Sequence, residues 1–210
     1  MVLVAAAVVF VAALAAVLVS IADSGSKKKL TVAQPKARAT TKSLTLVVGA
    51  VDVQSAGPPA TVSPGVRRAL MRATQQYFDD AIQGPLRHKA VNVAYTQVFD
   101  SGVKGDAAGR DRAALTESAT GVIRGAAHLL ATPVRIDGLG DPTGKLVLVA
   151  TTFALQAKAN TPTGPLTIRR HTELTFANEF GKWVVTAYRV TVRRSIGPSA
   201  TASTVHSGTT

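Results

Sequence analysis

The sequence predicts an N-terminal transmembrane helix followed by an α+β domain, in which helices pack on one face of a curved antiparallel sheet. The first 22 residues contain no charged side chain. Apolar residues recur with a helical period early in the remaining chain, and they alternate with polar residues in long segments near its end. Helices and strands that are segregated along a chain in this way are typical of the α+β class.

The stretch from residue 2 to residue 22, VLVAAAVVFVAALAAVLVSIA, contains Ser20 as its one polar residue. A helix needs roughly 20 apolar residues to cross a hydrocarbon core of about 30 Å. We expect an uncleaved anchor, because the run is longer than the apolar region of a signal peptide and no basic residue precedes it. A signal peptide is the alternative, since Ser20-Ile21-Ala22 offers small residues for cleavage.

The formal net charge of +12 is unevenly distributed. Residues 23–43 carry six basic side chains against Asp23, and we expect a flexible basic linker there. The membrane-flanking residues are Lys27, Lys28 and Lys29, and the positive-inside rule places them in the cytoplasm. The Thr/Ser/Pro-rich linker and tail favour the opposite orientation, and we expect the domain to be extracytoplasmic.

Residues 44–195 form the predicted domain, and the Ser/Thr-rich residues 196–210 form a disordered tail. A first strand is expected at 44–53. A helix at 64–83 follows, with Ser63 as its N-cap and Gly84-Pro85 as its stop. Between them and the later strands, we expect a strand or short helix at 91–99, a glycine-rich loop at 101–109 and a short helix at 110–119.

Four later segments show the period of a strand. The first contains Pro133, which is typical of a sheet edge or a bulge. A tight hairpin at 179–181 joins the last two strands. The predicted strands are 128–137, 145–159, 166–178 and 182–194.

Several classes of function are excluded. The chain has no cysteine, which excludes a disulfide scaffold, a thiolate zinc module and a cysteine enzyme. It has no phosphate-binding loop, nucleophile elbow or HExxH motif, so we expect no cofactor and no metal. The basic residues are scattered and aromatic residues make up 5%, which argues against nucleic acid as a partner.

The order of the elements resembles the nuclear transport factor 2-like (SnoaL-like) superfamily. The resemblance rests on the 64–83 helix and on the terminal hairpin TELTFANEFGKWVVTAYRVTV, where a glycine turn precedes Lys-Trp and an apolar strand. With its N-terminal membrane segment and linker, the chain also resembles actinobacterial membrane proteins associated with mammalian-cell-entry (Mce) systems. The resemblance implies a cone-like domain whose enzymes use the mouth between sheet and helices.

Four residues are weak catalytic candidates because their side chains transfer protons in such a mouth: Tyr77, Asp80, His128 and Tyr188. The adjacent Asp79 and Asp80 diverge by about 100° on a helix, and we expect a solvated face there. Strand parity places His171 and Glu173 on the exposed side of their strand, and Trp183 and Tyr188 on opposite faces of theirs. The sequence identifies no ligand pocket.

These observations predict a membrane-anchored, non-catalytic accessory protein of the cell envelope, whose domain binds a protein partner or a small ligand. The alternative is a small-molecule-binding protein or an isomerase- or cyclase-type enzyme that uses the cone pocket. The expected partners are the membrane and an envelope protein. A second copy of the chain, paired sheet to sheet, is a further candidate that the resemblance implies.

Overall fold

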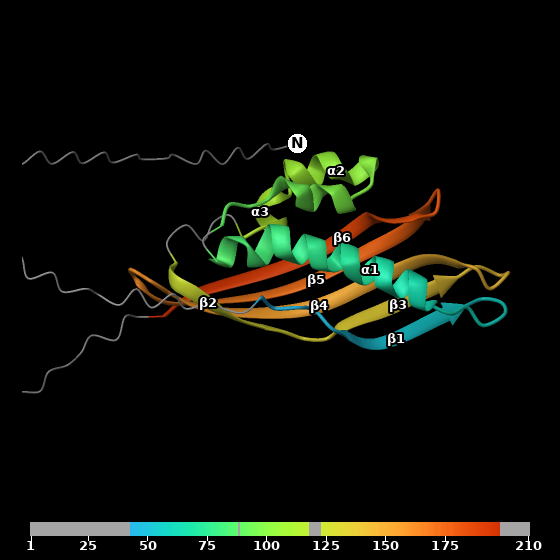
Figure 1. Ribbon diagram of the computed structural model, residues 1–210, viewed down its shortest axis with the longest axis horizontal. Coiled ribbons are helices and arrows are strands. Elements are labelled where there is room, and N and C mark those ends of the chain that lie inside the picture. Colours follow the sequence, from blue (N-terminus) through green and yellow to red (C-terminus); the bar gives the residue numbers. More distant parts are fainter. Residues whose placement is uncertain (1–42, 88, 118–122, 198–210) are drawn as a thin grey trace, which may run out of the picture. The chain divides into compact units, whose positions relative to one another are not determined.

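The computed structural model describes residues 43–87, 89–117 and 123–197, which form a six-stranded sheet with a layer of helices on it (Figure 1). The predicted anchor at 2–22, the lysines Lys27, Lys28 and Lys29, and most of the predicted tail lie outside the described residues. Among the residues that the structure describes, no helix has the length and apolarity needed to cross a membrane.

The strands follow the order β1-β3-β4-β5-β6, and β2 pairs with the free end of β4. Three long strands dominate the sheet, as the alternating segments of the sequence predict. The strands are β1 (Val48–Ser55), β2 (Arg124–Ala131), β3 (Val134–Gly140), β4 (Leu146–Thr161), β5 (Gly164–Glu179) and β6 (Lys182–Ile196).

The predicted fold class was wrong, because the sheet is mixed rather than antiparallel and strands outweigh helices, at 48% against 28%. The parallel pair is β1 with β3, where Asp52 aligns with Asp137. A parallel pair needs a long crossover, usually one that contains a helix. Here all the described helices come between β1 and the later strands along the chain. This long connection lets β3 run alongside β1 in the same direction.

The single strand predicted at 128–137 is two strands separated by Thr132 and Pro133. Proline has no N–H to donate to a ladder, so pairing breaks there. Thr132 bridges the break, because its backbone N–H donates to the Ala154 carbonyl and its Oγ1 accepts from the Ala154 N–H, each at 2.9 Å. As a result, β2 and β3 pair with different halves of β4.

The predicted helix at 64–83 is present in two parts, α1 (Pro64–Tyr77) and the π-helix η1 (Phe78–Gln83). Ser63 caps it by accepting from the Val66 N–H at 3.3 Å. The helix ends at Gly84, as predicted. The remaining helices are η2 (Pro85–Arg87), η3 (Val93–Val98), α2 (Ser101–Ala108) and α3 (Arg112–Leu115).

The glycine-rich loop predicted at 101–109 is a helix, α2, so that prediction was wrong. Asp100 caps it by accepting from the Gly102 N–H at 3.1 Å, and the Asp100 N–H donates to the Val185 carbonyl of β6 at 3.0 Å. The cap and the attachment to the sheet therefore stabilise a helix that its glycines disfavour.

All these helices lie on one side of the sheet, and no other element of the described residues covers its opposite side (Figure 1). On the helix-facing side, Phe153 of β4 packs edge-to-face against Phe78 at 6.0 Å, and Thr151 contacts Thr74 at 3.1 Å. The opposite side of the sheet, termed the open face, carries the alternate residues of each strand, which are mostly half-buried or exposed.

A bulge in β6 changes which residues lie on each face. Thr175 of β5 aligns with Ala187 and the next residue, Phe176, aligns with Val185, which leaves Thr186 unpaired. The extra residue reverses the alternation, so Trp183 and Tyr188 both lie on the helix-facing side, in contact with the core. The prediction that they lie on opposite faces was wrong for this reason.

Candidate ligand groove on the open face of the sheet

Of the four weak catalytic candidates, Tyr77 lies at the centre of the core, between α1 and β5. Its side chain is fully buried and its hydroxyl donates to the Leu115 carbonyl at 2.7 Å. Arg170 of β5 donates to the same hydroxyl at 3.4 Å. Burial raises the pKa of Tyr77 to about 12, against the opposing effect of the Arg170 charge. The phenol therefore stays protonated and serves as a structural donor.

Tyr188 also lies on the helix-facing side, and Phe99 connects it to Tyr77. The Phe99 ring packs edge-to-face with both, at 6.2 Å from Tyr77 and 5.5 Å from Tyr188. The Tyr188 hydroxyl donates to Asp111 Oδ2 at 2.7 Å. Burial, followed by this hydrogen bond to a carboxylate, raises the pKa of Tyr188. Neither tyrosine has the lowered pKa that a proton acceptor needs at neutral pH.

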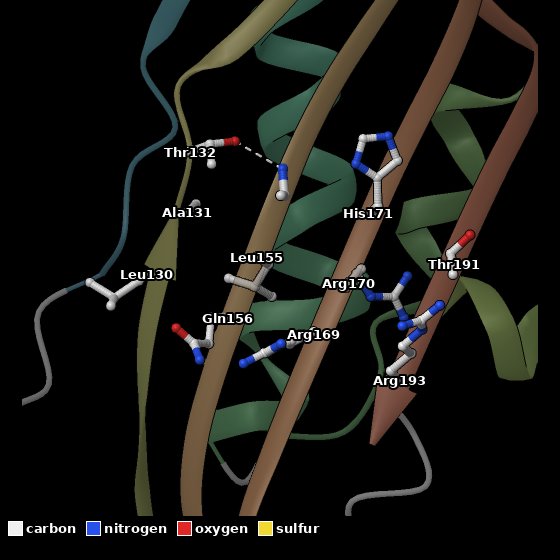
Figure 2. A pocket seen from close by; sticks show the side chains of 11 residues that line it. Leu130, Ala131, Thr132, Leu155, Gln156, Arg169, Arg170, His171, Thr191 and Arg193 are labelled. Atoms are coloured by element: carbon white, nitrogen blue, oxygen red, sulfur yellow. Dashed lines mark hydrogen bonds between the residues drawn. The ribbon is translucent and has the colours of Figure 1, made fainter. Parts of the chain in front are cut away.

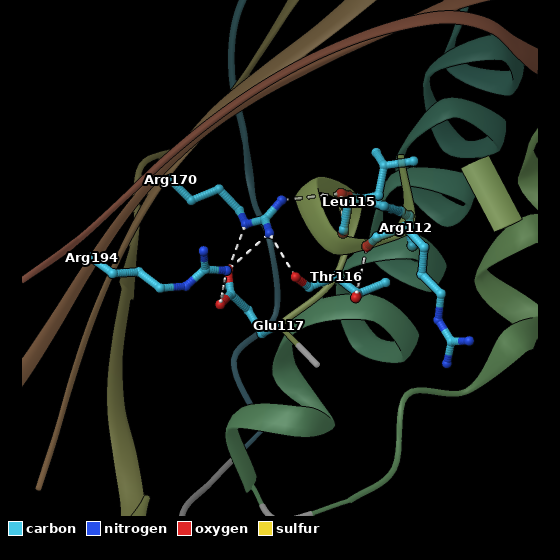
Figure 3. Close-up of polar contacts among 7 residues, drawn as sticks. Arg112, Leu115, Thr116, Glu117, Arg170 and Arg194 are labelled. Carbon is cyan, nitrogen blue, oxygen red and sulfur yellow. Dashed lines mark hydrogen bonds and ion pairs between the residues drawn. The ribbon is translucent and has the colours of Figure 1, made fainter. Parts of the chain in front are cut away.

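A buried ion pair joins Glu117, which follows α3, to Arg170 of β5 and Arg194 of β6 (Figure 3). Glu117 Oε1 accepts from Arg170 Nε at 3.0 Å and from Nη2 at 2.8 Å, and both side chains are fully buried. Arg194 binds the other carboxylate oxygen at 2.9 Å. Breaking such a pair leaves an uncompensated buried charge, so it fixes the chain after α3 to the sheet. On this side of the sheet, the Arg170 guanidinium thus contacts both the Glu117 carboxylate and the Tyr77 hydroxyl.

The other two candidates lie apart from this region. Asp80, on η1, accepts a hydrogen bond from Asn92 Nδ2 at 2.9 Å. His128 lies on the exposed side of β2 and aligns with Lys158 of β4. The structure therefore joins Tyr77 and Tyr188 through Phe99, and it does not bring the four candidates to one site.

The sequence predicted a solvated face for Asp79 and Asp80, and the structure differs from this prediction at Asp79. Asp79 is half-buried, and its Oδ1 accepts from Gln75 Nε2 at 2.9 Å and also from Gln83. The side-chain oxygens of these two glutamines accept from the backbone N–H groups of Leu46 and Leu44. Asp79 thus orients two amides that hold the chain just before β1.

The open face contains a groove of about 660 Å³ that crosses β2, β4, β5 and β6 (Figure 2). Leu155 and Arg170 border the groove, but their side chains are buried on the helix-facing side. In Figure 2 the other lining side chains stand in front of the strands, and α1 runs behind them. The strand register arranges these side chains in two neighbouring rows. One row is Ala154, His171 and Thr191; the other is Leu130, Gln156, Arg169 and Arg193.

Arg169 and Arg193 lie directly opposite each other on β5 and β6. Opposite residues of an antiparallel pair have Cβ atoms about 5 Å apart, and like charges in that arrangement destabilise the sheet. Both side chains are exposed, and neither has an ion-pair partner among the described residues. The groove lining includes no carboxylate. Two positive charges therefore face the groove without a counter-charge from its walls.

The other end of the open face shows the contrast. There Arg135 of β3 binds Asp137 at 2.8 Å and Asp52 of β1 at 3.1 Å. The arginine at this end is paired with two carboxylates, whereas the two arginines in the groove are paired with none among the described residues. The groove is therefore the part of the open face that is suited to an anionic group.

The described residues offer no metal site, since no three His, Asp or Glu side chains gather among them. His171 and Glu173 share the open face, as their parity predicted, with His171 exposed and Glu173 half-buried.

Comparison of the chain with models of protein families, with curated proteins and with solved structures gave no match. The resemblance to the nuclear transport factor 2-like superfamily accordingly stays a prediction.

The sequence did not indicate the groove. In the sequence, Arg169, Arg170, Arg193 and Arg194 form two basic doublets, one in each of the last two strands. Arg170 and Arg194 bind Glu117 on the helix-facing side, whereas Arg169 and Arg193 lie opposite each other on the open face. Strand alternation does indicate that the two arginines of each doublet point to opposite faces of the sheet. It does not indicate that Arg193 lies opposite Arg169, because that pairing depends on the β6 bulge.

Proposed function

We propose that the protein is a non-catalytic binding protein of the cell envelope, attached to the membrane through residues 2–22, whose open sheet face is the binding surface. The observation that supports this most directly is the groove, with two opposed arginines that lack counter-charges. Because two opposed like charges destabilise the fold, their presence on this surface indicates a functional role.

The packing of the opposite side of the sheet supports a non-catalytic function. Tyr77, Phe99 and Tyr188 are in ring contact there, and the Arg170–Glu117 pair lies fully buried beside Tyr77. An enzyme of the isomerase or cyclase type requires an accessible apolar pocket with a titratable group inside. The candidate groups on this side instead hydrogen-bond within the protein.

The proposal predicts that binding partners contact the open face rather than the helical layer. We would place a photo-crosslinking amino acid at Thr191, which is exposed in the groove, and at Ala113, which is exposed on α3. Irradiation of cells that produce each full-length variant should give reproducible adducts from position 191 and few from position 113. The readout is the set of shifted bands on a denaturing gel, followed by mass spectrometry.

Two results would contradict the proposal. One is the absence of adducts from position 191, although the variant is folded and abundant, together with no binding of a small molecule in the groove. The other is the same adduct pattern from both positions, which indicates random collisions. An adduct that is a second copy of this chain identifies a homodimer through the sheet, and an envelope protein identifies a hetero-complex.

A further inference from the structure

The groove has an apolar part beside its charged part. Leu130 of β2 is 55% exposed although it is a large apolar side chain, and it aligns with Gln156 of β4. Beside this row, the short side chain of Ala154 leaves the groove floor low between Thr132 and His171. Most of the lining surface is apolar, with a few polar groups on the β5 and β6 side. Small-molecule sites commonly combine an apolar lining with a few converging polar groups.

The charged part suits a planar or tetrahedral oxyanion. A guanidinium group presents donors in a fixed fork that matches carboxylate and phosphate oxygens. Because Arg169 and Arg193 are opposite neighbours, one such group placed between them contacts both and also relieves their repulsion. Thr191 and His171, in the adjacent row, bring further polar groups to the same wall.

We propose that the groove binds a small organic acid with an apolar body. Its carboxylate or phosphate lies between Arg169 and Arg193, and its apolar body lies toward Leu130 and over Ala154. This inference rests on the proposed function, since it names the ligand class of the same open face.

The distribution of charge favours a small molecule over an extended acidic peptide. The unbalanced basic residues are confined to one end of the open face. Farther along the same face, Glu173 lies on β5 and the Asp52–Arg135–Asp137 cluster lies on β1 and β3. A long acidic chain laid along the strands would meet these carboxylates. The volume of about 660 Å³ is also within the usual range for small-molecule sites.

The experiment measures binding of 1-naphthyl phosphate and 2-naphthoate to the purified full-length protein by isothermal titration. Uncharged 2-naphthol and inorganic phosphate test the two halves of the ligand separately. We expect both naphthyl acids to bind, and each half alone to bind much more weakly. Arg193→Gln should weaken binding of the acids by about tenfold or more, because it removes a charged hydrogen-bond donor. Arg169→Gln/Arg193→Gln should abolish it.

Arg189→Gln is the matched control. Arg189 lies on the same strand and the same face, but it is opposite Glu173 and outside the groove. This variant loses the same charge and should bind the acids within about twofold of the wild type. Thermal unfolding provides a second readout, because Arg193→Gln removes a like-charge pair and should not lower the melting temperature. A structural role for Arg193 predicts a lower melting temperature instead.

Three outcomes would overturn the inference: naphthol binding as tightly as the acids, Arg189→Gln weakening binding as much as Arg193→Gln, or an acidic peptide binding where the naphthyl acids do not. In the last case the groove is a site for a protein partner. Adducts from position 191 would then still support the proposed function, so failure of the ligand class is distinguishable from failure of the binding surface.

Discussion

At the scale of single residues, the three tyrosines of the chain have the same structural role. Each hydroxyl donates at 2.7 Å: Tyr77 to Leu115, Tyr95 to Ala107 and Tyr188 to Asp111. Every acceptor lies in the segment of α2 and α3, between residues 107 and 115. Burial raises the pKa of all three phenols. The tyrosines therefore hold the small helices onto the rest of the core as neutral donors.

This arrangement predicts a loss of stability at high pH. A phenol whose pKa is raised by folding stabilises the native state fully below its unfolded pKa of about 10. That contribution is lost as the pH rises through the folded pKa, which for Tyr77 is about 12. We expect the free energy of unfolding to fall between pH 10 and pH 12, by about 2–3 kcal/mol from Tyr77 alone. Urea unfolding at a series of pH values measures this fall.

Tyr77→Phe separates this effect from the titration of lysine and arginine. The variant is less stable at neutral pH, by about 1–2 kcal/mol for the lost hydrogen bonds. It should lose less stability than the wild type between pH 10 and pH 12. Tyrosinate absorbance gives an independent measurement, and its appearance near pH 10 in the folded protein would contradict the burial of these phenols.

At the scale of elements, periodicity predicted the helix and strands that bury a regular apolar face. It missed elements whose stability comes from contacts with other segments. The three long strands and the 64–83 helix are close to their predicted bounds, because each alternates or repeats against one core. Helix α2 buries Ala107 and has glycines at 102 and 105, so its sequence carries almost no amphipathic signal. Its stability comes from the Asp100 cap and from contact with β6.

Because α2 is limited by propensity rather than by packing, Gly105→Ala should stabilise the protein. A Cβ at this position has no heavy atom within 4 Å, and the residue lies in the helix interior. The expected gain is about 0.5–1 kcal/mol in the free energy of unfolding, measured with urea. Gly57→Ala is the opposite control, because its Cβ would clash with the Pro142 carbonyl oxygen, and this variant should be less stable. A loss of stability in Gly105→Ala would show that α2 is strained in another way.

The β6 bulge explains why the site was not predictable from strand alternation. The hairpin begins with Glu179 opposite Lys182, and an unbroken ladder from there would place Arg169 opposite Val192. The unpaired Thr186 shifts the ladder by one residue and places Arg193 there instead. A single inserted residue thus moves Arg193 to the open face and Arg194 to the buried ion pair with Glu117.

At the scale of the whole molecule, strand direction and charge placement both depend on parts of the chain that are distant in sequence. We predicted an antiparallel sheet from the three long strands, and these three strands do pair antiparallel. The direction of β1 is set by the route of the helical layer, which no local period reveals. Similarly, the net charge of +12 does not reveal that the arginine at one end of the open face is paired with carboxylates and that those at the other end are not.

The proposed membrane attachment is a prediction about the whole chain. Residues 2–22 carry no charge, and residues 23–43 carry six basic side chains against Asp23. The full-length protein should resist extraction from membranes by alkaline carbonate, and deletion of residues 2–22 should release it.

We also expect protease added to intact cells or spheroplasts to digest the domain. The positive-inside rule favours the opposite result, because Lys27, Lys28 and Lys29 follow the apolar run. Complete protection of the domain, with digestion after the cells are opened, would therefore place the sheet and its groove in the cytoplasm. In that case the open face would meet cytoplasmic acids rather than those of the envelope.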